Sequence, residues 1–195
     1  MKTIDYYNNN SQAFYDRTIN ADITDSYEKF LRYLPEKAEI LDAGCGVGRD
    51  IKYFLSKGHS VSAFDSSEKM VDLACRETGV NVTHSTFQEL NFENMFDGIW
   101  AQASLLHIPY DLTQDIYEKI HRSLKPNGIF YASYKYGDSY VETPERDFYN
   151  MNEINVMPYL MGLFNVIELW QEKDNRSKLA PSPDGMWLNF IARKI

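Results

Sequence analysis

Short apolar runs alternate with amphipathic stretches along the first two thirds of the chain. Five runs have the length and composition of buried strands, at residues 38–43, 60–65, 81–87, 95–101 and 129–135. Around them, apolar residues recur at helical spacing, which predicts helices near residues 25–34, 49–57 and 112–124, and another after a cap at Ser66. This alternation predicts a parallel sheet joined by right-handed crossovers.

The pattern changes after residue 135. A polar loop at 137–150 leads into a short helical pattern at 153–161, and strands are predicted at 165–172 and 187–192. A loop rich in charge, Ser and Pro (173–185) joins these strands without a helix, so we expect them to pair antiparallel at an edge. The sequence therefore predicts an α/β fold: a mainly parallel seven-stranded sheet with an antiparallel edge strand and helices on both faces.

Composition narrows the possible partners. The net charge of −8 disfavours a nucleic-acid partner, which needs patches of Lys and Arg. No apolar run reaches the ~18 residues of a membrane span, and the first residues lack the apolar core of a signal peptide, so we expect a cytoplasmic protein without membrane contact. The two cysteines form no CxxC and no His/Cys/Asp cluster has ligand spacing, so we expect no metal.

Aromatic side chains interrupt the otherwise polar residues 1–23, among them Tyr6, Tyr7 and Phe14. This segment is either a partly ordered leader or a lid that places aromatic rings over a ligand. The sequence leaves both interpretations open.

A glycine-rich loop follows the first predicted strand, with Gly44, Gly46 and Gly48 ahead of a helical pattern. Glycine allows a tight turn and lets backbone N–H groups approach a ligand closely. Strand, glycine loop and helix in this order mark the ligand-binding end of an open α/β sheet. We interpret Cys45 as structural, because only a small residue fits between two glycines.

Asp65 ends the second predicted strand, 21 residues after Gly44. In nucleotide-binding α/β folds, an acidic residue here accepts hydrogen bonds from ribose hydroxyls. The alternative is a carboxylate that only stabilises the start of a helix. Spacing and strand position together favour ribose binding.

Polar residues also follow the third and fourth predicted strands. Gln88 and Glu89 can reach an adenine amino group, with Phe87 and Met70 beside the base, or they form a simple polar loop. After the fourth strand, three polar residues are expected at the crevice where such sheets bind ligands: Gln102, Ser104 and His107.

Four segments together resemble the motifs of class I S-adenosylmethionine-dependent methyltransferases. They are LDAGCGVG at 41–48, FDSSEKM at 64–70, FDGIW at 96–100 and LKPNGIF at 124–130. They occur in the family's order and spacing, over about residues 35–135. Residues 103–107, 132–137 and 187–189 further resemble a bacterial branch of tellurite-resistance-associated methyltransferases, although the loop at 138–146 lacks that branch's glycines.

The resemblance implies S-adenosylmethionine as the methyl donor and gives several residues a role. Gly44, Cys45 and Gly46 would hold its methionine and ribose parts. Asp42, directly or through water, would place the ammonium group. Arg49 would meet the carboxylate or would only be an exposed residue of the first helical turn.

The remaining cofactor contacts follow from the same resemblance. Asp65 would hold the ribose diol next to Ser66. Gln88 and Glu89 would reach the adenine, and the Ala101 carbonyl would accept a hydrogen bond from the amino group.

The acceptor side of the site is less defined. A general base is needed only when the acceptor loses a proton on methylation, and His107 is the best candidate. Its alternative role is a structural cap on the following turn. Tyr134, Lys135 and Arg146 are predicted to face the acceptor, although the two cations are otherwise ordinary surface charges.

These observations predict a single methyltransferase domain. Residues 1–35 form a lid and a helix, residues 36–135 the cofactor-binding core, and residues 136–195 the substrate-side loop with the last two strands. We expect a small-molecule acceptor and a monomer or homodimer. The alternatives are a cofactor-binding protein without catalysis and an NAD-dependent oxidoreductase, whose GxGxxG is absent here.

Cofactor identity can be tested by calorimetric titration of the purified protein. S-adenosylmethionine and S-adenosylhomocysteine should each bind, and NAD should give no heat, because the glycine spacing is GxGxG. A clear NAD isotherm, or no heat with either sulfur compound, would contradict the assignment.

Overall fold

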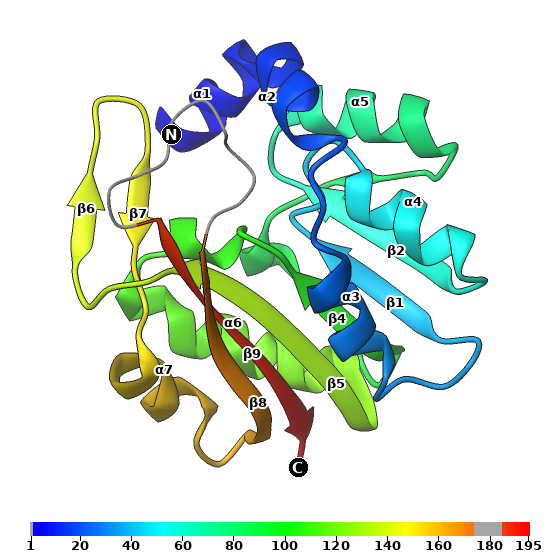
Figure 1. Cartoon of the computed structure of the whole chain (residues 1–195), viewed down its shortest axis with the longest axis vertical. Helices are drawn as coiled ribbons and strands as arrows, with labels where there is room; N and C mark the ends of the chain where they lie inside the picture. Colours follow the sequence, from blue (N-terminus) through cyan, green and yellow to red (C-terminus); the bar gives the residue numbers. More distant parts are fainter. Residues whose placement is uncertain (1, 174–184) are drawn as a thin grey trace.

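The computed structural model describes residues 2–173 and 185–195, which form one central sheet flanked by helices (Figure 1). The seven strands lie in the order β3-β2-β1-β4-β5-β9-β8. Their bounds are Glu39–Ala43 (β1), Ser60–Asp65 (β2), Thr83–His84 (β3), Phe96–Ala101 (β4), Leu124–Lys135 (β5), Phe164–Lys173 (β8) and Met186–Lys194 (β9).

The sheet confirms the predicted fold class and corrects one detail of its edge. Strands β1 to β5 pair in parallel, and β9 pairs antiparallel with both β5 and β8. The antiparallel strand therefore lies inside the sheet, and the edge strand β8 runs in the same direction as the first five. The loop predicted at 173–185 lies, apart from its two end residues, outside the described residues.

Helices cover both faces of the sheet. One face packs against α3, α4 and α5, and the other packs against α6 and α7. The helices are α1 Lys2–Asn9, α2 Ser11–Thr18, α3 Thr24–Leu31, α4 Arg49–Ser56, α5 Glu68–Thr78, α6 Tyr110–Ser123 and α7 Glu153–Leu160, with 3-10 turns η1 Phe87–Glu89 and η2 Leu105–His107. Within the part of the chain that the structure describes, no helix combines the length and apolarity needed to cross a bilayer.

The N-terminal segment is helical and packed, which differs from the partly ordered leader that was one of its two interpretations. Helices α1 and α2 lie at the carboxyl ends of the strands beside α5 (Figure 1). Tyr7 and Phe14 pack on an apolar cluster formed by Val47, Met70 and Leu73. The aromatic residues noted in the sequence therefore attach this segment to the sheet edge where ligands bind in such folds.

Three local predictions were wrong. The strand predicted at 81–87 is only Thr83–His84, an edge strand with β2 as its one neighbour, and a 3-10 turn follows it. The cap of α5 is Ser67, whose hydroxyl accepts from the Met70 N–H, whereas Ser66 precedes it. The loop predicted at 137–150 contains a hairpin of two strands, β6 Tyr140–Glu142 and β7 Asp147–Tyr149.

A buried carboxylate fastens three elements together beneath the loop at 44–48. Asp50, in the first turn of α4, accepts hydrogen bonds from the Tyr27 hydroxyl of α3 and from Trp100 Nε1 of β4 at 2.8 Å. Arg49 adds two contacts at 2.5 and 3.1 Å. Burial opposes ionisation, but Arg49 and the donated hydrogen bonds hold the pKa of Asp50 below its ordinary value.

Replacing Asp50 should therefore cost much stability. Asp50→Ala leaves the buried Arg49 without its carboxylate, which is expected to lower the free energy of unfolding by about 3–5 kcal/mol in urea denaturation. The matched control is Asp72→Ala on α5, whose pair with Lys69 is exposed and 3.7 Å long. That change should cost less than about 1 kcal/mol. Equal losses in both variants would contradict the role of Asp50.

Candidate functional site

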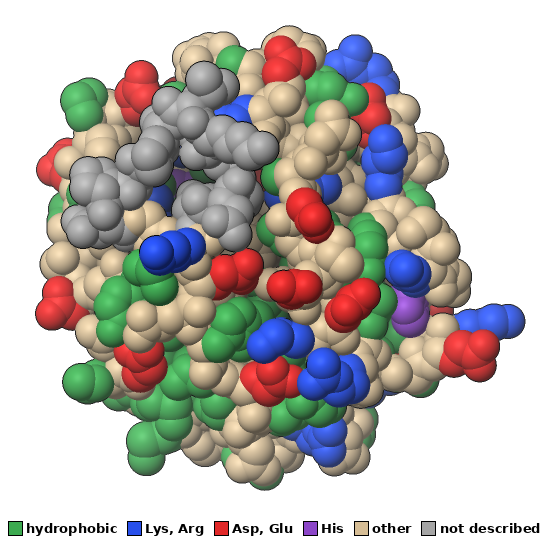
Figure 2. All heavy atoms as spheres, in the orientation of Figure 1, with side chains coloured by type: hydrophobic (Ala, Val, Ile, Leu, Met, Phe, Trp, Pro, Cys, Tyr) green, Lys and Arg blue, Asp and Glu red, His purple; other side chains and the backbone are tan. Residues whose placement is uncertain are grey.

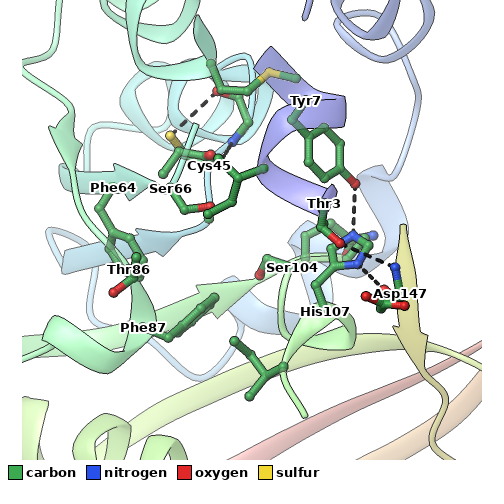
Figure 3. Close-up of a pocket in the computed structure, with 18 of the residues that line it drawn as sticks. Thr3, Tyr7, Cys45, Phe64, Ser66, Thr86, Phe87, Ser104, His107 and Asp147 are labelled. Atoms are coloured by element: carbon green, nitrogen blue, oxygen red, sulfur yellow. Dashed lines mark hydrogen bonds between the residues drawn. The ribbon is translucent and has the colours of Figure 1, made fainter. Parts of the chain in front are cut away.

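A cavity of about 610 Å³ opens at the carboxyl ends of β1, β2 and β4 (Figure 3). Its volume is typical of small-molecule pockets. The chain crosses there from one side of β1 to the other, and open α/β sheets bind ligands at this kind of crossing. The walls come from the loop at 44–48, α1, α2, η1, η2, the start of α6 and the β6–β7 hairpin.

The glycine loop forms the floor of the cavity. Gly44 has a φ of +77°, and a Cβ there would lie 2.5 Å from the Cβ of Ser104. The Ser104 hydroxyl donates to the Ala43 carbonyl at 2.7 Å, which fixes the β4 end against the loop. Gly44, Cys45 and Gly46 all line the cavity, and burial raises the pKa of the Cys45 thiol, which supports its structural interpretation.

Asp65 lies at the end of β2 and faces the same cavity. Its two oxygens accept the Gly46 N–H at 2.8 Å and the Ser67 N–H at 2.9 Å. Burial raises the pKa of Asp65, and these two bonds oppose that shift. Each carboxylate oxygen has two lone pairs, so the group can still accept from hydroxyls of a ligand. Ser66 and Met70 line the cavity beside it.

The predicted Gln88–Glu89 pair is divided by the turn that carries it. Phe87 and Gln88 line the cavity. The Glu89 carboxylate instead accepts from the Thr86 N–H at 2.9 Å and the Thr86 hydroxyl at 3.0 Å. This capping box occupies Glu89 outside the cavity, as the polar-loop alternative expected.

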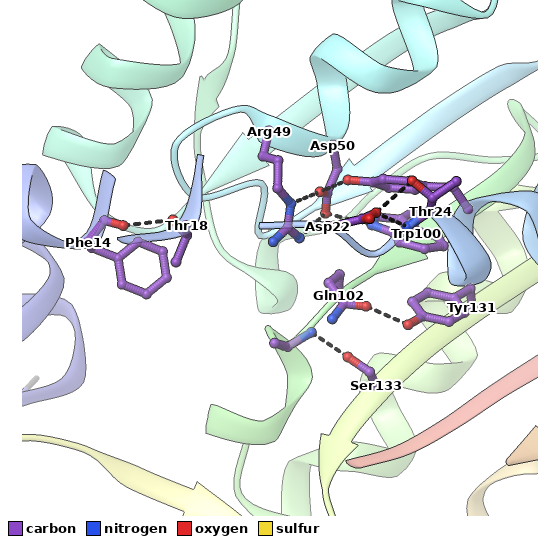
Figure 4. Close-up of polar contacts among 12 residues, drawn as sticks. Phe14, Thr18, Asp22, Thr24, Arg49, Asp50, Trp100, Gln102, Tyr131 and Ser133 are labelled. Carbon is purple, nitrogen blue, oxygen red and sulfur yellow. Dashed lines mark hydrogen bonds and ion pairs between the residues drawn. The ribbon is translucent and has the colours of Figure 1, made fainter. Parts of the chain in front are cut away.

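Arg49 lines the cavity, and Asp42 lies buried beside this region. The Arg49 side chain is only 15% exposed and is paired with Asp50, so the exposed-residue interpretation is wrong (Figure 4). Asp42 Oδ2 is buried without a partner among the described residues. Burial, with Asp50 nearby, raises the pKa of Asp42 well above its usual range. A cationic ligand group nearby would remove that penalty.

The end of β4 supplies one wall residue and one buried residue. Gln102 lines the cavity, and its amide oxygen accepts from the Tyr131 hydroxyl (Figure 4). Ala101 is fully buried and does not line the cavity.

His107 also lines the cavity, and both of its ring nitrogens are hydrogen-bonded. Nδ1 lies 2.6 Å from the Asp147 carbonyl oxygen, and Nε2 lies 2.9 Å from the Tyr7 hydroxyl. Burial lowers the pKa of His107 to about 4, with Arg146 and Lys135 acting in the same direction. The ring bonds to α1 and to the hairpin, so it does not cap the following turn.

Four residues predicted on the acceptor side do not line the cavity: Tyr6, Tyr134, Lys135 and Arg146. Tyr134 is buried on the α6 side of β5, where its hydroxyl meets that of Tyr117 at 2.9 Å. Lys135 lies over the Phe148 ring at 3.6 Å, and Arg146 lies over the Tyr6 ring at 4.2 Å. Alternation along a strand explains Tyr134, because one position decides which face a side chain takes.

Much of the cavity wall around His107 was not predicted from the sequence. This wall comes from α1, the start of α6 and the hairpin, with Lys2, Thr3, Ile4, Ile108, Pro109, Leu112, Tyr140, Glu142, Asp147 and Tyr149. The runs at 140–142 and 147–149 around Pro144 were a usable hairpin signal. In residues 2–173 and 185–195, no group of three or more His, Cys, Asp or Glu side chains could hold a metal ion.

Comparison with known sequences gives a consistent family. Residues 40–128 match the family model described as a methyltransferase domain. An uncharacterized methyltransferase of Staphylococcus carnosus is 24% identical over 194 residues, covering 92% of this chain and 94% of that protein. A ubiquinone biosynthesis O-methyltransferase of Rickettsia conorii is 29% identical over 98 residues, which cover 48% of this chain and 33% of that protein.

Solved structures agree with this result. The 1,6-didemethyltoxoflavin-N1-methyltransferase of Burkholderia thailandensis, solved with 1,6-didemethyltoxoflavin and S-adenosylhomocysteine, superposes with a TM-score of 0.76 at 25% identity over 98% of this chain and 84% of that one. A Methanosarcina mazei methyltransferase has the same fold, with a TM-score of 0.75 at 20% identity over 87% of this chain and 98% of that one. Residues 40–128 of the chain thus form a methyltransferase domain, and the whole chain is similar in sequence and fold to S-adenosylmethionine-dependent methyltransferases.

Proposed function

We propose that the chain methylates a small-molecule acceptor bound in the cavity at the carboxyl ends of β1, β2 and β4. The main observation that supports this proposal is that the glycine loop and Asp65 line the same cavity as Tyr7 and His107. The Burkholderia neighbour, which holds a small acceptor together with S-adenosylhomocysteine, supports the same arrangement. When bound, S-adenosylmethionine supplies a methyl group made electrophilic by its sulfonium.

The floor of the cavity suits the methionine part of this cofactor. Gly44 and Gly46 let a ligand approach the loop backbone without a Cβ in the way, while the loop's own N–H groups hold its shape by donating to the Phe64 carbonyl and to Asp65. Arg49 would pair with the carboxylate, since Asp50 holds its guanidinium at the wall. Asp42, with its unpartnered oxygen, would stabilise the ammonium group directly or through water.

The β2 side of the cavity suits the nucleoside part. Asp65 would accept from the ribose diol, with Ser66 beside it. Phe87 and Met70 would flank the adenine, and Gln88 would reach its amino group. The Ala101 carbonyl stays proposed as an acceptor for the cofactor's amino group.

The acceptor itself is the finer part of this proposal. Curated relatives include ubiquinone and sterol methyltransferases, of whose length the chain spans about a third, so they name no substrate for it. The face in Figure 2 has Lys and Arg interspersed with Asp and Glu, which supports a small acceptor over nucleic acid. The tellurite-associated branch stays a prediction, which transfer of labelled methyl groups to reduced tellurium anions would check.

Other properties also stay proposals. We propose one domain divided at residues 35 and 135, with α1 and α2 as the lid. We further propose a cytoplasmic monomer or homodimer, which fractionation of cells and sedimentation of the purified protein would check.

Asp65→Ala should weaken S-adenosylhomocysteine binding by about 1.5–3 kcal/mol, because hydrogen bonds to a charged group are lost. That is roughly 10- to 150-fold in Kd by calorimetry. The control is Asp72→Ala, an exposed carboxylate on the neighbouring helix, which should leave Kd unchanged. Unchanged affinity in Asp65→Ala would remove Asp65 from the binding site.

A further inference from the structure

We propose that Tyr7 is a catalytic residue: its hydroxyl takes the proton that the acceptor loses and passes its own proton to His107. This inference rests on the proposed function, methyl transfer within this cavity. It adds a residue from the N-terminal helix to the reaction and narrows the acceptor to a compound whose methylated atom carries a proton.

Hydrogen-bond chemistry fixes the direction of the Tyr7–His107 contact (Figure 3). The Asp147 carbonyl can only accept, so His107 Nδ1 carries a hydrogen and donates to it across 2.6 Å. In a neutral imidazole, Nε2 then has a free lone pair. The Tyr7 hydroxyl must therefore be the donor across 2.9 Å. Its oxygen has two lone pairs, of which one faces the Arg146 guanidinium and the other is left for a ligand.

The surroundings keep both groups in these protonation states. His107 is neutral because it is buried, with the cations Arg146 and Lys135 near its ring and only the Asp147 backbone and carboxylate opposing them. Burial also raises the pKa of Tyr7, although Arg146 lies near its hydroxyl, so Tyr7 stays protonated at rest. A protonated donor thus faces a neutral base.

The proton balance of the step is simple. As the acceptor atom bonds to the methyl carbon, the carbon–sulfur bond breaks and its electron pair remains on sulfur. The acceptor atom then holds one proton too many, and its acidity rises sharply. That proton moves to the Tyr7 oxygen while the Tyr7 proton moves to His107 Nε2, so no free tyrosinate forms. His107 becomes an imidazolium that still donates to the Asp147 carbonyl.

The same hairpin residue positions both members of the pair. Asp147 orients His107 through its carbonyl, and its carboxylate binds the Lys2 ammonium of α1 at 2.8 Å. Its N–H donates to the Thr3 hydroxyl at 3.3 Å. At the other end of α1, the Asn8 side chain accepts from the Ser67 hydroxyl at 2.7 Å. Helix α1 is thus held near both of its own ends, which fixes the position of Tyr7.

The cavity walls near this pair indicate the class of acceptor. Ile4, Ile108, Pro109, Leu112 and Tyr149 present apolar or aromatic surface there, while the charged side chains of the same wall, Lys2, Glu142 and Asp147, pair with one another. Such walls fit an aromatic or heteroaromatic ring, and the relay requires an O–H or N–H on it. A thiol that is already ionised would need no proton relay.

The relay can be tested by measuring transfer of labelled methyl groups to a panel of acceptors. The panel contains phenols, heteroaromatic N–H compounds and thiophenol, at a pH above the pKa of the thiol. Tyr7→Phe and His107→Asn should each reduce transfer to O–H and N–H acceptors by about 10²–10⁴-fold. The double variant should lose no more than either single one, because the two act as a unit. Transfer to the thiolate and the Kd of S-adenosylhomocysteine should change less than about threefold.

The matched control is Tyr15→Phe, which removes a hydroxyl from α2 in the same N-terminal layer. Its hydroxyl pairs with Glu77 outside the cavity. This variant should keep wild-type transfer to every acceptor. Three results would overturn the relay. They are equal losses for thiolate and O–H acceptors in Tyr7→Phe, additive losses in the double variant, and a wild-type enzyme that methylates only the thiolate.

A nitrogen-15 NMR titration of the complex with S-adenosylhomocysteine tests the pair without any acceptor. His107 should show a protonated Nδ1 and a bare Nε2 and should stay neutral down to about pH 4. Tyr7→Phe should raise its pKa, because a bond to the neutral form is lost. A protonated Nε2, or transfer to no panel member, overturns the relay; loss of S-adenosylhomocysteine binding in wild type instead overturns the proposed function.

Discussion

The buried Asp50 carboxylate is the interaction on which the site's geometry depends. It joins α3, α4 and β4 through Tyr27, Arg49 and Trp100. Such a charge is tolerated only because every side of it has a donor. The same contacts hold the Arg49 guanidinium at the cavity wall, so the group that stabilises the fold also positions a side chain of the cavity.

Close packing between two loops then determines the shape of the cavity floor. The loop after β1 approaches the loop after β4 so nearly that no side chain fits at Gly44 beside Ser104. Because both loops leave the sheet at its crossing point, one short contact fixes the loop after β1 relative to the loop after β4. Asp65 completes this arrangement by accepting the Gly46 N–H, which couples β2 to the same loop.

The acceptor side is built differently, from segments far apart in the sequence. His107 is 100 residues from Tyr7 and 40 from Asp147, yet hydrogen bonds join all three. None of these contacts follows a sheet ladder or a helical repeat. They depend on α1 and the β6–β7 hairpin meeting over the cavity, and the ion pair between Lys2 and Asp147 connects those two segments.

Local patterns in the sequence were enough to predict the strands, the glycine loop, the place of Asp65 at the end of β2 and the methyl donor. Each of these depends on short motifs or on the spacing between them. The buried faces of β1, β4 and α6 were predictable for the same reason. The Thr86–Glu89 capping box is also a local signal, because its T-x-x-E spacing is visible in the sequence. Tertiary structure alone decided that Tyr134 packs against α6 and that Tyr7 meets His107. Those outcomes depend on which face a side chain takes and on which distant segment covers it, and spacing along the chain contains neither.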